Sequence, residues 1–153
     1  MSMTIEMIQT WTRRSRINQR SHYESAKIYN VIYYCLGIPL VVITACLGAI
    51  NSANKEIISS KNTSILLFSI SILAALQTFL KLSERAQKHK MVASKYGAIR
   101  RELEVLLVKP KVNDSDIKAM KNKMDAIALE APSIPYFIWK RTETKLEERN
   151  ANI

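Results

Sequence analysis

Glycine, histidine and cysteine are all scarce in this chain of 153 residues. Its three glycines stand far apart at Gly37, Gly48 and Gly97, so no glycine-rich loop of the kind that cradles a nucleotide phosphate is present. The two cysteines, Cys35 and Cys46, would lie about 16 Å apart along a helix, which is beyond the reach of a disulfide. No cysteine and histidine spacing typical of a metal site occurs either.

The usual groups of a catalytic centre are also missing. His22 and His89 are the only histidines, and the sequence pairs no nucleophile with a base and no two acids in a catalytic spacing. We therefore predict that the protein is not an enzyme and has no catalytic residue, cofactor or metal. For His89 two interpretations stay open: a polar residue in the seam of a helix pair, or a pH sensor.

Charge is absent from two long apolar stretches, which run from Ile28 to Asn54 and from Asn62 to Leu80. About 20 apolar residues in a helix cross the ~30 Å hydrocarbon core of a bilayer, and each stretch is about that long. The pattern predicts a helical hairpin through a membrane, so the lipid bilayer is an expected partner. Lysines stand at the ends of the stretches: Lys27, Lys55, Lys61 and Lys81.

A soluble protein with two buried helices is the alternative, since 48% apolar residues is ordinary for a globular domain. Buried helices of soluble proteins usually keep a polar stripe, whereas the stretch from Val31 to Ile43 has no charge on any face. A cleaved signal peptide would have a shorter apolar core nearer the N-terminus. We therefore expect the first span to act as an uncleaved anchor.

Basic residues gather on both sides of the hairpin, and the connection between the spans carries few of them. By the positive-inside rule, this distribution predicts a multi-pass integral membrane protein with both termini cytoplasmic and the short loop external. It also accounts for the net charge of +10 without a nucleic-acid partner, because the basic residues are mixed with acids along the flanking helices. The basic flank residues are Arg13, Arg14, Arg16, Arg20 and Lys27 before the first span, and Lys81, Arg85, Lys88, Lys90, Lys95, Arg100 and Arg101 after the second.

The predicted fold is an all-α membrane protein with a single two-transmembrane domain over residues 1–153. No proline and one glycine occur from Asn62 to Leu107, so the second span should continue as one long cytoplasmic helix packed with N- and C-terminal helices. The expected elements are an N-terminal amphipathic helix (1–27), the first transmembrane helix (28–50), a short external loop (51–61), the second transmembrane helix (62–81), and cytoplasmic helices with a tail (82–153).

One face of the long cytoplasmic helix is apolar and requires a partner helix. Its members are Leu82, Ala86, His89, Ala93, Tyr96, Leu103 and Leu107. Pro110 ends this helix, and Asn113 to Asp116 offer N-capping oxygens for a further helix that carries Ile117, Met120, Met124 and Ile127.

The prolines of the stretch Ala131 to Pro135 stop this further helix. The aromatic segment from Tyr136 to Trp139, followed by Lys140 and Arg141, fits either an interfacial anchor or a plug in the cytoplasmic bundle. The charged tail from Thr142 onward is expected to fray.

Small and polar side chains within the spans are the most informative candidate sites. Lipid gives no hydrophobic driving force for helix association, so such faces mark either protein contacts or water. They indicate close packing within the hairpin or between subunits, or a polar pore lined by several copies of the hairpin. The candidates for pore lining or helix packing are Ser71, Ala75, Thr78 and Gln77 in the second span, and Thr44 and Gly48 in the first.

A second set of candidates is basic and lies past the second span. Lys88, Lys90, Lys95, Arg100 and Arg101 fit either a patch that contacts anionic lipid or a nucleotide ligand, or an ordinary solvated helix face.

Several segments of the chain resemble the SLATT superfamily of two-transmembrane effectors, which are associated with SMODS and SLOG-type systems. The likeness lies in Leu76-Gln77-Thr78-Phe79-Leu80-Lys81, Glu84-Arg85-Ala86-Gln87-Lys88-His89, Tyr96, Arg100-Arg101-Glu102-Leu103-Glu104, the basic N-terminal helix, the tyrosine-rich entry to the first span and the break at Ala131-Pro132-Ser133-Ile134-Pro135.

This resemblance implies a membrane-embedded effector that forms an oligomeric pore and damages membrane integrity or ion gradients when triggered. Because the sequence carries no sensor domain beside the hairpin, we expect a separate sensor or signalling protein, or a small ligand, to supply the trigger. In this interpretation, ion leakage depends on Ser71 and Thr78. The alternative is a nonconducting membrane scaffold or envelope protein that recruits a partner through its cytoplasmic helices, for which Arg100 and Arg101 matter instead.

Overall fold

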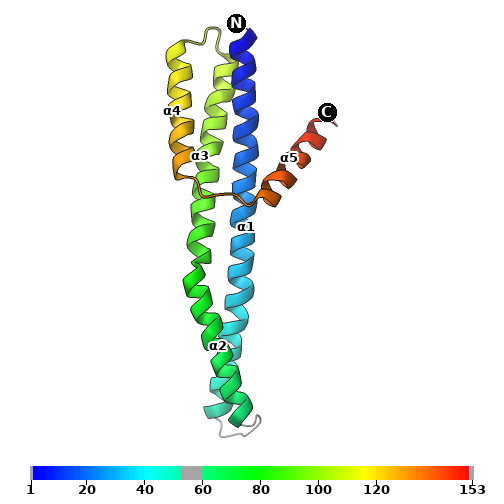
Figure 1. The fold of residues 1–153 in the computed structure, drawn as a ribbon, viewed down its shortest axis with the longest axis vertical. Coiled ribbons are helices and arrows are strands. Elements are labelled where there is room, and N and C mark those ends of the chain that lie inside the picture. Colours follow the sequence, from blue (N-terminus) through cyan, green and yellow to red (C-terminus); the bar gives the residue numbers. More distant parts are fainter. Residues whose placement is uncertain (1, 53–59, 152–153) are drawn as a thin grey trace. The chain divides into compact units, whose positions relative to one another are not determined.

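The computed structural model describes residues 2–52 and 60–151, and its regular secondary structure in these ranges is entirely helical (Figure 1). This confirms the all-α prediction for the described part of the chain. The helices are α1 (Ser2–Ser52), α2 (Ser60–Leu80), α3 (Leu82–Val108), α4 (Asp114–Glu130) and α5 (Tyr136–Ala151).

The chain divides into two compact units, and α1 and α3 each contribute to both. We call residues up to Lys27 and from Ala86 onward the bundle unit, and residues Ile28 to Arg85 the hairpin unit. The bundle unit contains the first half of α1, most of α3, and all of α4 and α5. The hairpin unit contains the second half of α1, α2 and the first residues of α3.

The N-terminal amphipathic helix and the first span form one uninterrupted helix, α1. Pro39 lies inside it, where its ring nitrogen cannot donate the usual hydrogen bond to the carbonyl four residues earlier. The predicted loop 51–61 is shorter than expected at both ends, because residues 51–52 belong to α1 and residues 60–61 to α2; residues 53–59 lie outside the described part.

The continuous helix predicted from Asn62 to Leu107 is divided at one residue. Lys81 has a φ of 47°, a left-handed conformation that is uncommon for a residue with a side chain, so α2 ends at Leu80 and α3 begins at Leu82. The backbone N–H of Arg85 donates to the Lys81 carbonyl at 3.0 Å, so helical hydrogen bonding resumes directly after the break. Neither glycine nor proline marked this position in the sequence.

The core of the bundle unit lies where α1, α3 and α4 meet, and the predicted apolar stripe of α3 forms much of it. Six of the seven stripe residues are buried and Leu107 is half-buried, which confirms that face. Small buried side chains of α1, such as Ser15 and Ser25, make room for close packing. The core cluster consists of Ile8, Val92, Tyr96, Ile99, Leu103, Met120 and Ile127.

Helix α4 begins at the predicted cap. The backbone N–H of Asn113 donates to the Asp116 carboxylate at 3.2 Å, and the N–H of Asp116 donates back to the Asn113 carbonyl at 3.0 Å. Lys109 also bonds this carboxylate, and that hydrogen bond is the main reason why the pKa of Asp116 is lowered. The helix ends at Glu130, before the proline-containing stretch, as expected.

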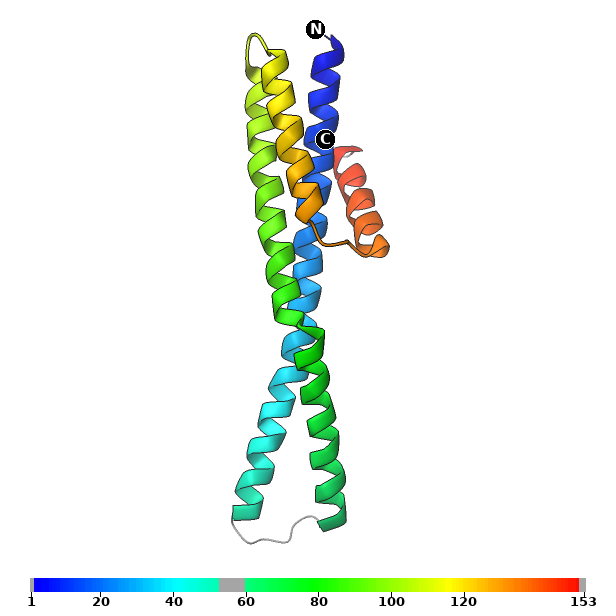
Figure 2. The ribbon, with the colours of Figure 1, turned by 60° about the vertical axis from the view of Figure 1, so that its left-hand side comes forward.

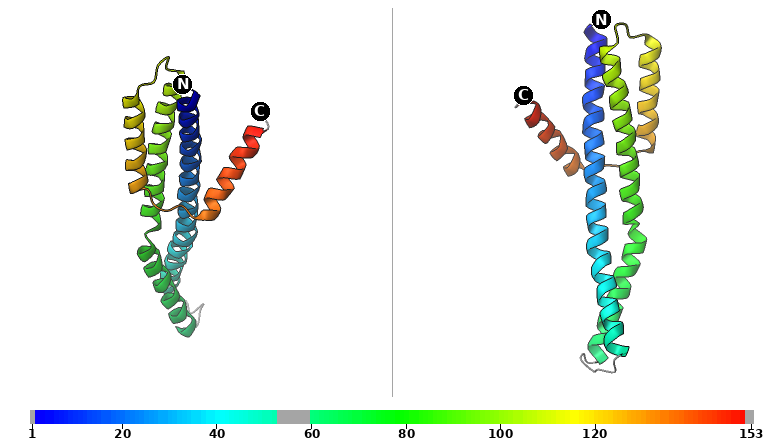
Figure 3. Two further views of the ribbon diagram at one scale, coloured as in Figure 1. Left: turned by 45° about the horizontal axis from the view of Figure 1, so that its top comes forward. Right: turned by 180° about the vertical axis from the view of Figure 1, so that it is seen from behind.

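Helices α4 and α5 lie on different sides of the α1–α3 pair in the bundle unit (Figures 1 and 3). Ion pairs tie α4 to α3, and the pair between Arg13 and Glu147 at 2.5 Å ties α5 to α1. The expectation that the chain frays from Thr142 is wrong, because α5 continues to Ala151 and buries Thr142 and Leu146 against the unit.

In the hairpin unit, α2 runs antiparallel to the second half of α1 (Figure 2). The two helices approach closely at Gly37, where a Cβ atom would lie 2.8 Å from the Gln77 Nε2. A larger side chain at this position would have to displace the amide of Gln77, which is the end of a flexible side chain.

Candidate functional site

The outer surface of the hairpin unit is apolar. Two helical stretches, within Met3–Ile50 and Lys61–Val108, are long and apolar enough to cross a membrane, and only 6% of the residues in the most apolar part of each are buried. Val41, Phe68 and Phe79 are 67%, 68% and 81% exposed. A helix in the core of a soluble protein buries such side chains. The hairpin unit therefore presents them to whatever surrounds it.

The hydroxyl groups predicted to line a pore bond to their own helices. Thr44 Oγ1 donates to the Leu40 carbonyl at 2.7 Å. Ser71 Oγ donates to Leu67 at 2.9 Å, and Thr78 Oγ1 to Ala74 at 3.0 Å. Each donor is thus satisfied four residues back along the helix, a bond that allows a hydroxyl to face hydrocarbon.

Three of the candidates form one exposed stripe on α2. Ser71, Ala75 and Thr78 follow a spacing of four and three residues, so they share a helix face, and all three are exposed. Gly48 on α1 is also exposed, and no atom lies within 4 Å of the Cβ that a side chain would add there. These positions let another helix approach closely, but the hairpin unit itself does not cover them.

Gln77 differs from the other candidates because it lies between the two helices. Its amide sits over Gly37 and borders a groove of about 360 Å³ that also touches Tyr33 and Val41. The side-chain amide of Gln77 makes no hydrogen bond with any residue in the described ranges. It is the one uncharged polar candidate whose hydrogen-bonding groups are not used within its own helix.

The basic candidates separate into neutralised and unneutralised residues. Lys95 pairs with Glu130, and Arg100 pairs with Glu104 at 3.3 Å, so these two contribute little free positive charge. Lys88, Lys90 and Arg101 are exposed and form no ion pair within residues 2–52 and 60–151. The predicted basic patch is therefore smaller than its sequence suggested.

A histidine pair that the sequence did not indicate lies inside the bundle unit. His22 on α1 and His89 on α3 are both 2% exposed, and their Nδ1 atoms lie 2.9 Å apart, so one ring donates and the other accepts. The Tyr96 ring stacks on His22 with centroids 5.8 Å apart. The contact joins residues 67 positions apart, which local spacing cannot reveal.

Burial of this pair suppresses positive charge. Desolvation, together with the nearby His89 ring, lowers the pKa of His22 to about 4, and desolvation also lowers the pKa of His89. Desolvation raises the pKa of Tyr96, and a hydrogen bond with Asn18 partly offsets this. Near neutral pH the pair is therefore uncharged and packs as part of the core.

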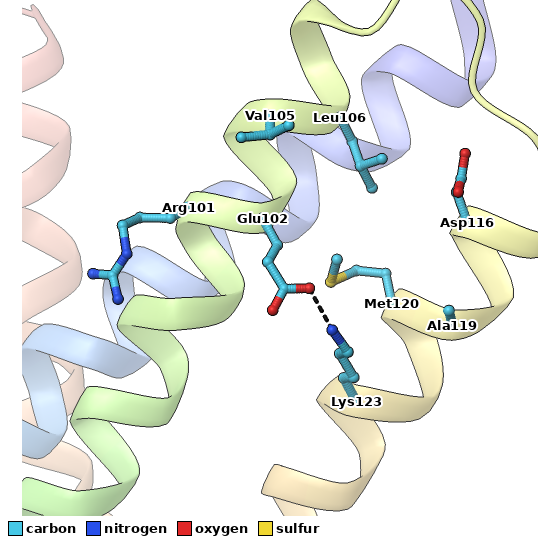
Figure 4. A pocket seen from close by; sticks show the side chains of 8 residues that line it. All are labelled: Arg101, Glu102, Val105, Leu106, Asp116, Ala119, Met120 and Lys123. Carbon is cyan, nitrogen blue, oxygen red and sulfur yellow. Dashed lines mark hydrogen bonds and ion pairs between the residues drawn. The ribbon is translucent and has the colours of Figure 1, made fainter.

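A groove opens between α3 and α4 on the bundle unit, with a volume of about 460 Å³ (Figure 4). Val105, Leu106 and Met120 supply apolar walls, and an ion pair between Glu102 and Lys123 at 2.5 Å crosses one end. No sequence pattern indicates this groove, because it depends on how α4 packs back on α3.

No protein-family model, curated protein or solved structure matches this chain. Within the described residues, no group of three or more histidine, cysteine, aspartate or glutamate side chains could hold a metal ion. The candidate site is therefore a surface, namely the apolar exterior of the hairpin unit with its small-residue stripe.

Proposed function

We propose that this protein is an integral membrane protein whose hairpin unit crosses a lipid bilayer twice, with both termini in the cytoplasm. The supporting observation is the outward position of large apolar side chains such as Val41 and Phe68, which water disfavours by about 25 cal/mol per Å². Hydrocarbon removes this cost, and the self-bonded hydroxyls of Ser71 and Thr78 suit the same environment.

Within the membrane, several copies assemble through the exposed stripe of Ser71, Ala75 and Thr78 and form a pore that perturbs ion gradients when a separate signal releases it. Small residues favour this contact because they allow helix backbones to approach closely. The unpaired amide of Gln77 supplies a polar group that a pore can hydrate or that a second copy can bond. The resemblance to the SLATT superfamily supports the same assignment.

Membrane potential during induced expression in bacteria tests the pore. A voltage-sensitive dye compares the wild type with Ser71→Leu plus Thr78→Leu at equal membrane abundance. We expect high expression to open some pores without the signal, so that the potential collapses only in the wild type. Ser69→Leu is the matched control, because Ser69 is equally exposed and bonds the Ile65 carbonyl in the same way but lies on the opposite face of α2. An unchanged potential in the wild type contradicts conduction without a trigger and favours the second candidate.

A nonconducting scaffold is the second candidate, and the groove between α3 and α4 favours it. Its apolar walls at Val105, Leu106 and Met120 suit an apolar side chain of a recruited protein. For this function, Val105→Asp abolishes recruitment, while Ser71→Leu has no effect. The two candidates therefore predict opposite results for the same pair of variants.

A further inference from the structure

The first turn of α5 exposes two aromatic rings that the bundle unit does not use. Tyr136 and Phe137 are 74% and 65% exposed, whereas the next residue, Ile138, is only 5% exposed. The N–H groups of Ile138 and Trp139 donate to the Pro135 carbonyl at 3.0 and 3.2 Å, so a regular helical turn holds the rings. In this segment, Ile138 therefore packs inward, whereas the rings of Tyr136 and Phe137 face outward.

Polarity changes sharply along the exposed face of α5. Its first turn carries rings, while the following turns carry charges: Lys140 pairs with Glu143 at 3.3 Å, and Glu147 pairs with Arg13 at 2.5 Å. Arg141 is exposed and forms no ion pair with any described residue. The N-terminal end of α5 is therefore apolar with a cation beside it, and the rest of its exposed face is charged.

The pair between Arg13 and Glu147 shows where the apolar end lies. Eleven residues separate Glu147 from Tyr136, about 16 Å of helix, and α5 runs antiparallel to α1 (Figure 2). Lys27, the last residue of α1 in the bundle unit, lies about 21 Å from Arg13 along α1. Measured along α1, the first turn of α5 therefore lies about 5 Å short of Lys27, or somewhat more because the two helices are inclined. This distance is comparable with the ~5–8 Å thickness of a headgroup layer.

Unneutralised cations surround the same end of the bundle unit. Lys27 on α1 and Lys88 and Lys90 on α3 are exposed and have no ion-pair partner in the described part of the chain. Farther along α3, Lys95 and Arg100 are paired with Glu130 and Glu104. Arg14, Arg20 and Arg101 are also exposed without an ion pair in the described ranges, so free positive charge is not confined to this end of the bundle unit. Lys27, Lys88 and Lys90 nevertheless place three such cations there.

We propose that Tyr136 and Phe137 insert into the headgroup layer of an anionic bilayer, and that Lys27, Lys88 and Lys90 contact its lipid phosphates. This inference rests on the proposed function, since the bilayer is the one that the hairpin unit spans. Tyrosine favours the membrane interface because its ring is apolar and its hydroxyl is polar. Basic side chains beside it attract the negative surface potential of such a leaflet. The first turn of α5 then contacts the membrane surface.

Spin labels on the full-length chain in lipid nanodiscs test the insertion. In a Cys35→Ala, Cys46→Ala background, single labels replace Phe137, Thr144 and Phe68, and each is probed with oxygen, which concentrates in lipid, and with a water-soluble nickel chelate. Thr144 is the matched control because it is exposed on the charged part of α5. Phe68 reports on the hairpin unit. The lipid is phosphatidylcholine, with or without phosphatidylglycerol.

We expect the ratio of oxygen to chelate access at position 137 to be several-fold higher than at position 144 when phosphatidylglycerol is present. A label at 137 that is as accessible to the chelate as the one at 144 overturns the proposal, and so does a label shielded from both reagents, because protein then covers the site. If the label at 68 is more accessible to oxygen than to the chelate in either of these cases, the proposal that the hairpin unit spans the bilayer still stands. A label at 68 that is open to the chelate overturns both.

The charge contribution has its own control. Lys88→Gln plus Lys90→Gln should lower the lipid access of the label at 137 in anionic nanodiscs and leave it unchanged in phosphatidylcholine alone. Arg101→Gln removes a charge about 16–20 Å farther along α3 and should change neither value. Equal effects of the two charge changes would overturn the role assigned to Lys88 and Lys90.

Discussion

The two halves of α1 differ in how much of their surface the protein itself covers. In the bundle unit, Ser15 and Ser25 have no exposed surface and His22 has almost none, while Ile5 is exposed on the same helix. In the hairpin unit, Val41 is 67% exposed and few side chains are buried at all. One continuous helix thus changes at about Lys27, from a half that is largely packed in a core to a half that exposes an apolar surface. Stability must therefore be considered separately for each half.

Charge on the hairpin surface should have the largest effect. A charged residue near the centre of a membrane helix costs about 2.5–3.5 kcal/mol on insertion scales, so Val41→Asp combined with Phe68→Asp should prevent stable insertion. Resistance of the protein to alkaline extraction from membranes measures the effect.

Met91→Asp is the control for this experiment, because Met91 is 51% exposed on the bundle unit and should accept the charge in water. Retention of the Val41→Asp, Phe68→Asp protein in the membrane at the wild-type level would refute the contrast between the two units.

Core truncation should distinguish buried from exposed positions within the bundle unit. Leu103 is fully buried in the bundle core, so Leu103→Ala should lower the free energy of unfolding of that unit by about 2–5 kcal/mol. Val105→Ala, at a position 64% exposed, should change it by less than about 0.5 kcal/mol. Thermal unfolding in nanodiscs measures both, and similar losses for the two variants would show that the core is placed incorrectly.

Acid should weaken the bundle unit through its histidine pair. Above pH 6.5 the histidines are mostly neutral in both the folded and the unfolded chain. Below pH 6.5 the histidines of the unfolded chain take up protons, whereas His22 in the folded chain stays neutral until the pH falls to about 4. The free energy of unfolding should therefore fall as pH decreases from 6.5 towards 4, by an amount on the order of 2–3 kcal/mol in total.

The measurement is the thermal midpoint of the full chain between pH 7 and pH 5, above the range in which Asp116, with its lowered pKa, titrates. Replacing both histidines, by His22→Gln and His89→Gln, should flatten the profile whatever it does to the midpoint at pH 7. An equally steep profile in this variant would show that other groups carry the acid sensitivity.

Local pattern sufficed to predict features that depend on neighbouring residues. The charge-free stretches predicted two helices able to cross a membrane, because such a signal is summed over many residues. The Asn113 to Asp116 cap was predicted because its hydrogen bonds close within four residues.

Features that depend on tertiary packing were missed. The His22–His89 contact and the groove beside Val105 arise from helices that meet far apart in sequence. The inward side chain of Ile138 also depends on where α5 docks, so its segment fitted both a plug and an anchor. The left-handed Lys81 had no signal, because lysine carries no preference for such a backbone.

The smallest predicted effect concerns a contact that occurs in both units, a glutamine side-chain amide lying against a glycine. A Cβ at Gly97 would lie 2.6 Å from Gln19 Nε2, much as one at Gly37 would lie 2.8 Å from Gln77 Nε2. Replacing glycine by alanine in a helix gains roughly 0.5–1 kcal/mol. In the bundle unit the displaced Gln19 amide reaches water, so Gly97→Ala should be neutral or slightly stabilising.

In the proposed bilayer the displaced Gln77 amide would meet hydrocarbon, so Gly37→Ala should lose that gain and be less stable than Gly97→Ala by about 1 kcal/mol. Unfolding of each unit in lipid–detergent mixtures, followed by energy transfer between a dye pair placed across it, measures the difference. Adding Gln77→Ala should restore the gain to Gly37→Ala, because no amide is then left to displace. A greater loss for Gly97→Ala than for Gly37→Ala would mean that water, not lipid, surrounds the second half of α1.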